Sequence, residues 1–223
     1  MKFLISGGTG LIGSQITKLL INNGHQINIL SRKSKISKTL NIKYYLWDPK
    51  SKKIDERCLD DVEVIINLAG SSVFSLWISS LKRKIINSRL IFLSTIYELL
   101  NNKKHKVKHL ISASAIGIYP NHQTISYSES SDFTIKSYLA DVVQKWESKA
   151  NDFKKLKLKV SILRIGLVLS KNGGILEKLI QFNKLRIVNT IDGGNQWQSW
   201  INIDDLANMF YFIAKNKYEG IFN

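Results

Sequence analysis

Gly7-Gly8-Thr9-Gly10-Leu11-Ile12-Gly13 follows an apolar run at residues 2–6 and opens an amphipathic stretch at residues 10–23. Glycines at this spacing permit a tight turn between a strand and a helix, and they let backbone N–H groups approach a pyrophosphate. The N-terminus of the helix favours the negative charge of such a group. The loop therefore predicts a dinucleotide-binding site, with a glycine-rich turn that holds no ligand as the alternative.

Apolar runs and amphipathic stretches alternate along the rest of the chain. The sequence predicts strands at residues 2–6, 26–30, 42–46, 62–68, 110–114 and 159–165. It predicts helices at residues 10–23, 82–100 and 137–150, and one capped by Asp204 and Asp205 that runs to about Ala214. Strands that alternate with helices form a parallel sheet covered on both faces. The expected fold class is therefore α/β, a Rossmann-type doubly wound parallel sheet.

The composition is typical of a globular protein that folds without disulfides or metals. The chain has 223 residues, of which 44% are hydrophobic and 22% charged, and no apolar run approaches the roughly 20 residues of a membrane span. A single cysteine, Cys58, cannot form an internal disulfide, which predicts a reducing compartment: the cytoplasm, or a stroma or matrix if the chain is organelle-encoded. The four histidines show no ligand spacing, so no metal site is predicted.

A net charge of +16 raises the question of a polyanionic partner. The lysines stand in short clusters without interleaved aromatic residues, as at residues 103–108 and 154–159. A charge run that lacks stacking residues has no means of reading bases, so a solvated surface is favoured over a nucleic-acid site. Neither a nucleic acid nor a membrane is expected as a partner.

The end of the second predicted strand bears on which cofactor is preferred. Proteins that prefer NAD place an acidic residue about 20 residues beyond the last glycine, where it binds the ribose 2′-hydroxyl. This chain has Ser31-Arg32-Lys33 there instead. A cationic pair suits the 2′-phosphate of NADP, so NADP is favoured over NAD, with two solvated side chains as the alternative.

Together these landmarks resemble the extended, atypical short-chain dehydrogenases/reductases of the NAD-dependent epimerase/dehydratase family. More narrowly, the chain is similar to a subgroup of epimerase-family proteins sometimes labelled cell-division inhibitors. The matching stretches run in order along the chain: residues 5–13, Trp47-Asp48-Pro49, residues 66–70, Ser88-Arg89, residues 112–119, Trp146-Glu147, residues 164–169, Gly173-Gly174 and residues 197–205.

The resemblance implies that Asn67-Leu68-Ala69-Gly70, at the end of the fourth predicted strand, lies along the ribose and pyrophosphate of the cofactor. Small residues at the carboxyl end of a strand leave room for a ligand in the crevice. The resemblance also places Trp47-Asp48 near the adenine, with local packing where the third strand ends as an equal alternative.

In active members of the superfamily, a serine polarises the substrate oxygen, a tyrosine transfers the proton, and a lysine four residues later lowers the pKa of that tyrosine. Ser114 falls at the serine position and Tyr138 near the tyrosine position, but the residue four positions on is Val142. Tyr138, Val142 and Trp146 also form the i, i+4, i+8 stripe of a core-facing helix. Ser114 and Tyr138 are therefore the candidate catalytic residues, with buried packing as the alternative for Tyr138.

Four further residues are expected near the substrate. Tyr119 follows Ser114 at the end of its strand and could line a pocket or pack in a turn. Trp197, Trp200 and Asn202 are expected in a strand or loop that borders the substrate cleft.

The predicted domain organisation is a dinucleotide-binding Rossmann domain at residues 1–170, to which residues 200–216 return, and a partial substrate-binding lobe at residues 171–223. Similar proteins continue beyond this point, so the C-terminal substrate lobe is expected to be incomplete. The helix at residues 82–100 is expected to form a two-fold interface if the protein is a homodimer.

Two functional hypotheses follow. The first is an atypical NADP-binding oxidoreductase or epimerase that acts on an unidentified small molecule, with Ser114 polarising a carbonyl or hydroxyl group. The second is a non-catalytic NADP-binding regulator, for example one linked to cell division, which Val142 and the short C-terminus favour.

Overall fold

The computed structural model describes residues 1–71, 79–122, 124–131, 137–184, 194 and 197–223. Its helices and strands alternate along most of the chain. In chain order they are β1 (Lys2–Ser6), α1 (Leu11–Asn22), β2 (Gln26–Ser31), β3 (Ile42–Asp48), β4 (Lys53–Ile54), β5 (Val64–Asn67), α2 (Ser79–Asn102), β6 (His109–Ala115), α3 (Tyr138–Asn151), β7 (Lys159–Ile165), β8 (Leu167–Ser170), α4 (Gly174–Lys184), β9 (Trp200–Asn202), α5 (Ile203–Asn216) and β10 (Gly220–Phe222).

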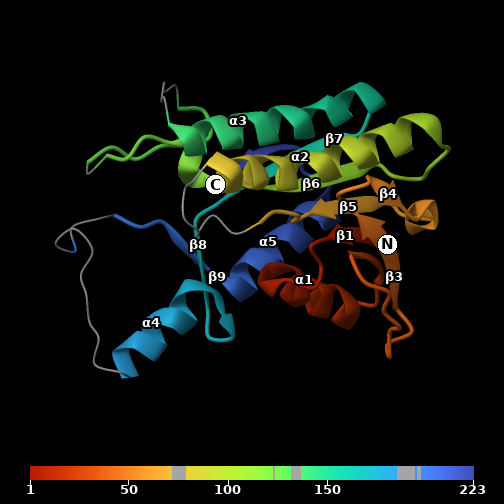
Figure 1. Cartoon of the computed structure of the whole chain (residues 1–223), viewed down its shortest axis with the longest axis horizontal. Coiled ribbons are helices and arrows are strands. Elements are labelled where there is room, and N and C mark those ends of the chain that lie inside the picture. The colour runs from red at the N-terminus through yellow and green to blue at the C-terminus, as the bar shows by residue number, and fades with distance from the viewer. Residues whose placement is uncertain (72–78, 123, 132–136, 185–193, 195–196) are drawn as a thin grey trace.

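Among the residues that the structure describes, the main sheet has eight strands in the order β10-β7-β6-β5-β1-β2-β3-β4. Figure 1 shows this sheet between α2 and α3 on one side and α1 and α5 on the other. Every neighbouring pair is parallel except β3 and β4, which run antiparallel. The strand order reverses at β1, where the chain builds outward first through β2 and then through β5. This reversal is the switch point at which open α/β sheets bind ligands, and it confirms the predicted Rossmann-type fold.

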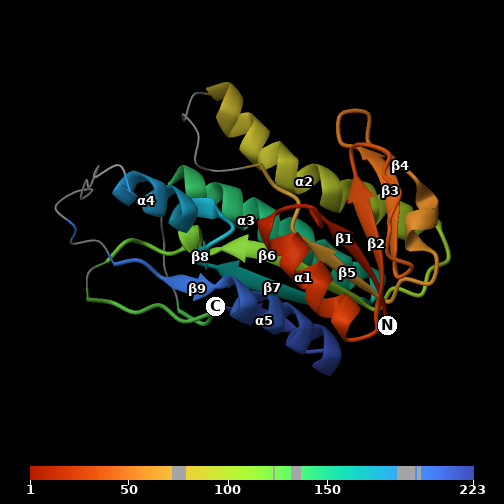
Figure 2. The same ribbon diagram turned by 90° about the horizontal axis from the view of Figure 1, so that it is seen from below.

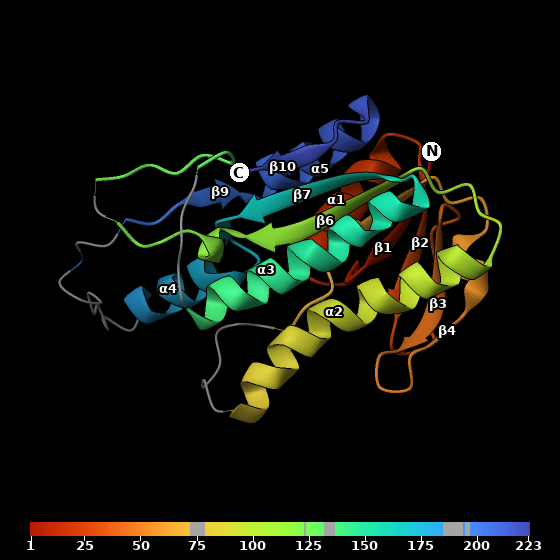
Figure 3. The same cartoon turned by 90° about the horizontal axis from the view of Figure 1, so that it is seen from above.

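Two helical layers cover the sheet. Helices α1 and α5 pack together on one face, and α2 and α3 pack together on the other, as the views from below and above show (Figures 2 and 3). A side-chain hydrogen bond from Gln15 to Asp204 joins the first pair of helices. Because both faces are covered, all four residues of β5 are buried. Its sequence begins with the apolar run Val-Ile-Ile and does not alternate between apolar and polar residues.

The core lies on both sides of the central strands. Phe3 and Ile5 of β1 are fully buried, as are Ile65 and Ile66 of β5 and Phe92 of α2. Burying a side chain of this size contributes about 1.5–3 kcal/mol. The strand and helix assignments made from periodicity hold in this region because the apolar pattern and the burial coincide.

Several features differ from the sequence prediction, among them the short strands β4 and β10, which it did not include. Helix α5 is capped by Asn202, whose Oδ1 accepts the N–H of Asp204 at 2.7 Å, so the predicted cap at Asp204 was wrong by two residues. Strands β8 and β9 form a separate two-stranded parallel sheet that the sequence did not predict. Helix α4, also unpredicted, packs on β8. Among the described residues, no helix has the length and apolar character needed to span a membrane.

Candidate functional site

The loop between β1 and α1 is built from close backbone contacts that only glycine permits. A Cβ atom on Gly13 would lie 2.3 Å from the carbonyl oxygen of Gly7. Gly7 itself has φ +73° and lies against the backbone of Leu68, where a Cβ would be 2.9 Å from the carbonyl oxygen. On the other side, a Cβ on Gly8 would be 2.9 Å from Ile29 of β2. The loop is therefore folded tightly onto the ends of β2 and β5.

The first turn of α1 faces outward above this loop. Gly10 is the N-cap, and no side chain caps the helix among the residues that the structure describes. Thr9 and Gly10 are exposed, while Leu11 and Ile12 are half-buried. Uncapped N–H groups at an exposed helix N-terminus attract an anion. The seven predicted loop residues thus form a glycine cradle, residues 7–13, whose geometry fits a pyrophosphate.

The carboxyl end of β2 presents the predicted cationic pair. Ser31 is buried, and its hydroxyl donates to the carbonyl oxygen of Lys33 at 2.8 Å, which folds this end of the strand into a turn. Arg32 and Lys33 are exposed. Their charges are therefore available to a ligand, beside the strand that neighbours β1.

The segment Asn67-Leu68-Ala69-Gly70 is fastened to β1 by a buried polar cluster. The hydroxyl of Ser6 donates to Asn67 Oδ1 at 2.8 Å, and the backbone N–H groups of Leu68 and Ala69 donate to Ser6 Oγ. The Asn67 amide also donates to Ser112 Oγ at 3.1 Å. The Asn67 side chain thus fixes the ends of β1, β5 and β6, and Gly70 at the end of this segment is exposed.

Trp47 lies in the core. Its side chain is 6% exposed, and its ring meets Phe92 edge-on with 5.5 Å between centroids. Asp48 is exposed and accepts hydrogen bonds from Lys50 N and Ser51 Oγ in the following turn. These contacts support the packing alternative for both residues.

Ser114 lies at the carboxyl end of β6, where its buried hydroxyl donates to Glu147 Oε1 of α3 at 2.6 Å. The Glu147 carboxylate also accepts two hydrogen bonds from Arg164 of β7, both at 2.9 Å. These hydrogen bonds raise the pKa of Arg164. Arg164 Nη1 in turn donates to the phenol oxygen of Tyr119 at 2.7 Å. A continuous polar network therefore runs from Ser114 to Tyr119.

Glu147 and Arg164 were not predicted as site residues. The available signal was a charged residue in the buried part of a strand: β7 reads Lys-Val-Ser-Ile-Leu-Arg-Ile, and Arg164 is 6% exposed. A buried charge requires a partner, which a neighbouring element must supply.

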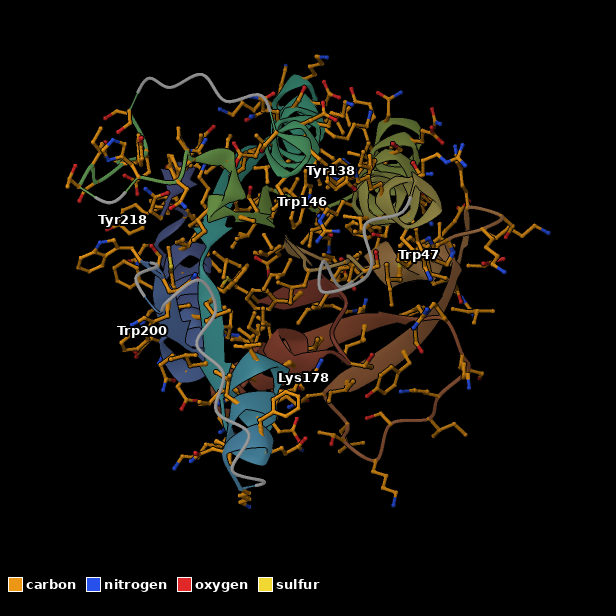
Figure 4. All side chains as sticks on the ribbon, turned by 60° about the vertical axis from the view of Figure 1, so that its left-hand side comes forward. Trp47, Tyr138, Trp146, Lys178, Trp200 and Tyr218 are labelled. Atoms are coloured by element: carbon orange, nitrogen blue, oxygen red, sulfur yellow. The ribbon has the colours of Figure 1, made fainter. Side chains whose placement is uncertain are left out.

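Tyr138 is the first residue of α3, and its hydroxyl donates to the carbonyl oxygen of Lys82 on α2 at 2.7 Å. Burial raises the pKa of Tyr138, a shift that the charge of Arg89 opposes. Val142 and Trp146 are buried, as the stripe of a core-facing helix predicts. Figure 4 shows Tyr138 and Trp146 on α3, toward α2 and the sheet. The Ser114 hydroxyl thus donates to α3 and the Tyr138 hydroxyl to α2, and among the described residues no hydrogen bond joins the two hydroxyl groups.

A cavity of about 830 Å³ opens beyond the carboxyl ends of β6 and β7. Tyr119, Arg164, Trp197 and Trp200 are among its lining residues, so three of the four residues expected near the substrate lie here. The fourth, Asn202, caps α5 instead. Trp200 lies at the outer rim of the molecule (Figure 4). Within the described ranges, no group of three or more histidine, cysteine or acidic side chains could hold a metal ion.

Comparison with known proteins places these features in a family. The model of the NAD dependent epimerase/dehydratase family matches residues 3–223. An epimerase family protein of Staphylococcus epidermidis is 36% identical over 223 residues, which cover 100% of this chain and 74% of the relative. An epimerase family protein of Staphylococcus aureus is 34% identical with the same coverage. The names of these relatives give the family and no role in cell division.

Solved structures share the fold. The human epimerase family protein SDR39U1, crystallised with NADPH, superposes with a TM-score of 0.82 at 24% identity, over 99% of this chain and 72% of the human chain. A nucleoside-diphosphate sugar epimerase from Corynebacterium glutamicum superposes with a TM-score of 0.83 at 28% identity, over 100% of this chain and 46% of the other.

Proposed function

This chain belongs to the NAD-dependent epimerase/dehydratase family, and from that premise we propose that it is an NADP-binding oxidoreductase or epimerase of a small molecule. The observation that carries the proposal is the glycine cradle, in which a Cβ on Gly13 would lie 2.3 Å from Gly7 O. A turn this tight leaves main-chain N–H groups and the helix N-terminus as the surface that a ligand meets. A pyrophosphate is the ligand that such a surface suits.

The preference for NADP over NAD rests on the end of β2. Arg32 and Lys33 are exposed there, and the acidic residue that would bind a free 2′-hydroxyl is replaced. A guanidinium forms a two-pronged contact with a phosphate, which makes Arg32 the residue of choice for the 2′-phosphate. The human relative crystallised with NADPH supports this choice, although other structures with this fold were solved with NAD.

We place the substrate in the cavity beyond β6 and β7. In the sheet, β7 is three strands from β1, which corresponds to about 14 Å at the usual strand spacing. A cofactor that extends from the glycine cradle toward β6 would therefore end beside this cavity. Aromatic walls from Trp197 and Trp200, with Arg164 and Tyr119 as polar groups, suit a small polar molecule.

A bound nicotinamide supplies hydride transfer, and the protein supplies binding, orientation and proton movement. Ser114 has one hydroxyl proton, which it donates to Glu147 at 2.6 Å. To polarise a substrate oxygen, Ser114 must turn that proton away from Glu147, which keeps its two hydrogen bonds from Arg164. Tyr138 would likewise have to leave the Lys82 carbonyl before it could transfer a proton.

The cellular setting and the domain division belong to the same proposal. We place the protein in the cytoplasm, with residues 1–170 and 200–216 as the cofactor domain and residues 171–223 as part of a substrate lobe. A homodimer would bring two copies of α2 together. Crosslinking through cysteines introduced on the exposed face of α2, for example at Lys84, would test that arrangement.

The test of the proposed function is a fluorescence titration of the chain with NADPH and with NADH. Wild type should bind NADPH, and Arg32→Ala should bind it about tenfold more weakly, the effect of losing about 1.4 kcal/mol. Binding of NADH should not change, because it lacks the 2′-phosphate. Arg83→Ala, an exposed arginine on α2, is the matched control.

Failure of the wild type to bind either nucleotide would overturn the proposal. Binding without turnover on any tested substrate would favour the non-catalytic regulator. The buried Val142 at the position where active relatives place a lysine is the observation that keeps this second function in view.

A further inference from the structure

Two arginine side chains, the buried Arg164 and the half-buried Arg89, differ in what compensates their charge. Arg164 forms an ion pair with Glu147, with 2.9 Å between Nη2 and Oε2. Arg89 on α2 is half-buried. Among the residues that the structure describes, no carboxylate lies within ion-pair distance of Arg89.

The contacts of Arg89 hold its guanidinium in one place without neutralising it. Nη1 donates to the carbonyl oxygen of Ser71 at 3.2 Å and to that of Ile85 at 3.0 Å. The guanidinium carbon lies 5.0 Å from the centre of the Trp146 ring, a cation–π contact. A guanidinium has five N–H donors, and among the described residues the hydrogen bonds of Arg89 use only Nη1, which leaves those on Nε and Nη2 for another acceptor.

The neighbouring Ser88 fixes the same loop from the other side. The backbone N–H of Ser71 donates to Ser88 Oγ at 2.9 Å, and the Ser88 hydroxyl donates to Ile85 O at 2.9 Å. Ser88 and Arg89 therefore hold both the N–H and the carbonyl of Ser71. The guanidinium is anchored to the segment that follows β5.

The position of Arg89 relative to the ligand crevice follows from Gly70. A Cβ on Gly70 would lie 3.3 Å from the Arg89 guanidinium carbon, and Gly70 itself is exposed. The strand that leads to Gly70 is paired with β1, where Asn67 is opposite Ser6, the residue before the glycine cradle. Arg89 thus lies directly behind the exposed end of β5, one strand from the proposed pyrophosphate site.

Burial lowers the pKa of Arg89, because desolvation disfavours the charged form, and nearby Tyr138 opposes the shift. An arginine nevertheless stays protonated in proteins. A cation that is desolvated in the protein gains more from an approaching anion than an exposed one does. The exposed Gly70 lies against this guanidinium, so an anion can approach from that side.

We propose that Arg89 is an oxyanion receptor of the ligand crevice, and that it binds a carboxylate or phosphate group of the small molecule held beside Gly70. The planar guanidinium fork matches the geometry of these two groups, and it matches no neutral group equally well. The inference rests on the proposed function for the location of the ligand. It adds the chemical class of the ligand to that function, since the group of the ligand that contacts Arg89 must be an anion.

The first experiment asks whether the anion belongs to the cofactor. NADPH is titrated into wild type, Arg89→Gln and the control Arg83→Gln, which removes the same charge from the exposed side of the same helix. If a cofactor phosphate meets Arg89, its loss weakens NADPH binding by about tenfold or more, and the control changes it by less than about twofold.

The second experiment asks whether the anion belongs to the substrate. Inorganic phosphate is titrated into the NADPH-loaded protein, and tryptophan emission is followed in wild type and in Trp146→Phe. The difference between the two isolates Trp146, whose ring contacts the Arg89 guanidinium. If a substrate anion meets Arg89, the difference signal saturates in wild type and in Arg83→Gln, and it vanishes in Arg89→Gln.

Either result supports the proposal and identifies the source of the anion. Unchanged NADPH affinity together with an unchanged phosphate response in Arg89→Gln overturns it. If wild type binds no nucleotide, the phosphate titration is run on the free protein, so the proposed function can fail while this inference stands. Should Arg89→Gln fail to fold, Arg89→Lys is the second variant, because it keeps the charge but loses the fork. Its phosphate affinity should lie between that of wild type and no binding. A wild-type affinity would overturn the role of the fork.

Discussion

Glu147 and Arg164 form a two-pronged ion pair inside the protein, with Nε to Oε1 and Nη2 to Oε2 both at 2.9 Å. Their side chains are 9% and 6% exposed. The pair joins α3 to β7 and receives the hydroxyl of Ser114 on one side. Three of the elements that surround the candidate site, α3, β7 and β6, are therefore positioned by one carboxylate and its partners.

Glu147→Gln should destabilise the protein by about 3–5 kcal/mol, because it leaves the Arg164 charge buried without a counterion. Urea unfolding at neutral pH measures the loss. The control Asp141→Asn breaks the exposed pair with Lys145 on the same helix and should cost less than about 0.5 kcal/mol. Equal effects of the two substitutions would show that the buried pair has no special role.

Gly13→Ala should abolish NADPH binding and lower the midpoint of thermal unfolding. The new methyl group would lie 2.3 Å from Gly7 O and 2.6 Å from the Gly8 Cα, both of which are backbone atoms that cannot move aside alone. Gly117→Ala is the control, since its Cβ would meet Leu139 at an ordinary 3.6 Å. Wild-type NADPH affinity in Gly13→Ala would contradict the cradle geometry.

Ser114→Ala should cost about 1.5–3 kcal/mol of stability, the range for a hydrogen bond to a charged group. NADPH affinity should stay within about twofold of wild type, because Ser114 is engaged with Glu147 rather than with the glycine cradle. Denaturant unfolding and a nucleotide titration on the same preparation measure both quantities. Ser34→Ala, on the exposed loop after β2, is the control. Undiminished stability would mean that the hydroxyl is not held by Glu147 in solution.

We expect His109 to lower the free energy of unfolding in mild acid. Burial lowers its pKa from 6.5 to about 4, so the folded protein keeps His109 neutral where the unfolded chain takes up a proton. The stability that His109 contributes is therefore complete above about pH 6.5 and is lost as the pH falls toward 4. His109→Gln should flatten the dependence of the urea midpoint over this interval. The exposed His122→Gln should leave that dependence as in wild type.

The alternation of strands and helices was predictable because the apolar pattern is local. Strand β1 and helix α1 begin and end within two residues of their predicted bounds, since the glycine loop and Asn23-Gly24 mark the turns. The N-cap of α5 was predicted two residues too late because several neighbouring residues are good capping residues. Asn202, Asp204 and Asp205 can all cap a helix, and the sequence does not show which backbone N–H faces which oxygen.

The part of the candidate site that the backbone of one loop forms was predictable from the sequence. The part that depends on contacts between distant side chains was not. The glycine cradle needs only residues 7–13. Ser114, by contrast, meets Glu147 across 33 positions of the chain, and Arg164 meets Tyr119 across 45. Contacts of this kind depend on how β6, α3 and β7 pack, which residue types at a fixed spacing do not specify. For the same reason, the sequence could not show that Arg89 lies behind Gly70.

The outer margin of the sheet bears on how the protein behaves when concentrated. Strand β4 pairs with Trp47 and Asp48 of β3, and Asp55 N donates to Leu46 O, so among the described residues the pairing along this edge stops before Tyr45 and leaves backbone groups open to another chain. Lys43 is exposed along this stretch, and the chain as a whole carries a net charge of +16. Two such edges repel each other before they can pair, which protects the protein from strand-by-strand aggregation. That protection is electrostatic and therefore weakens as salt is added, so the protein should be kept in buffers of low ionic strength.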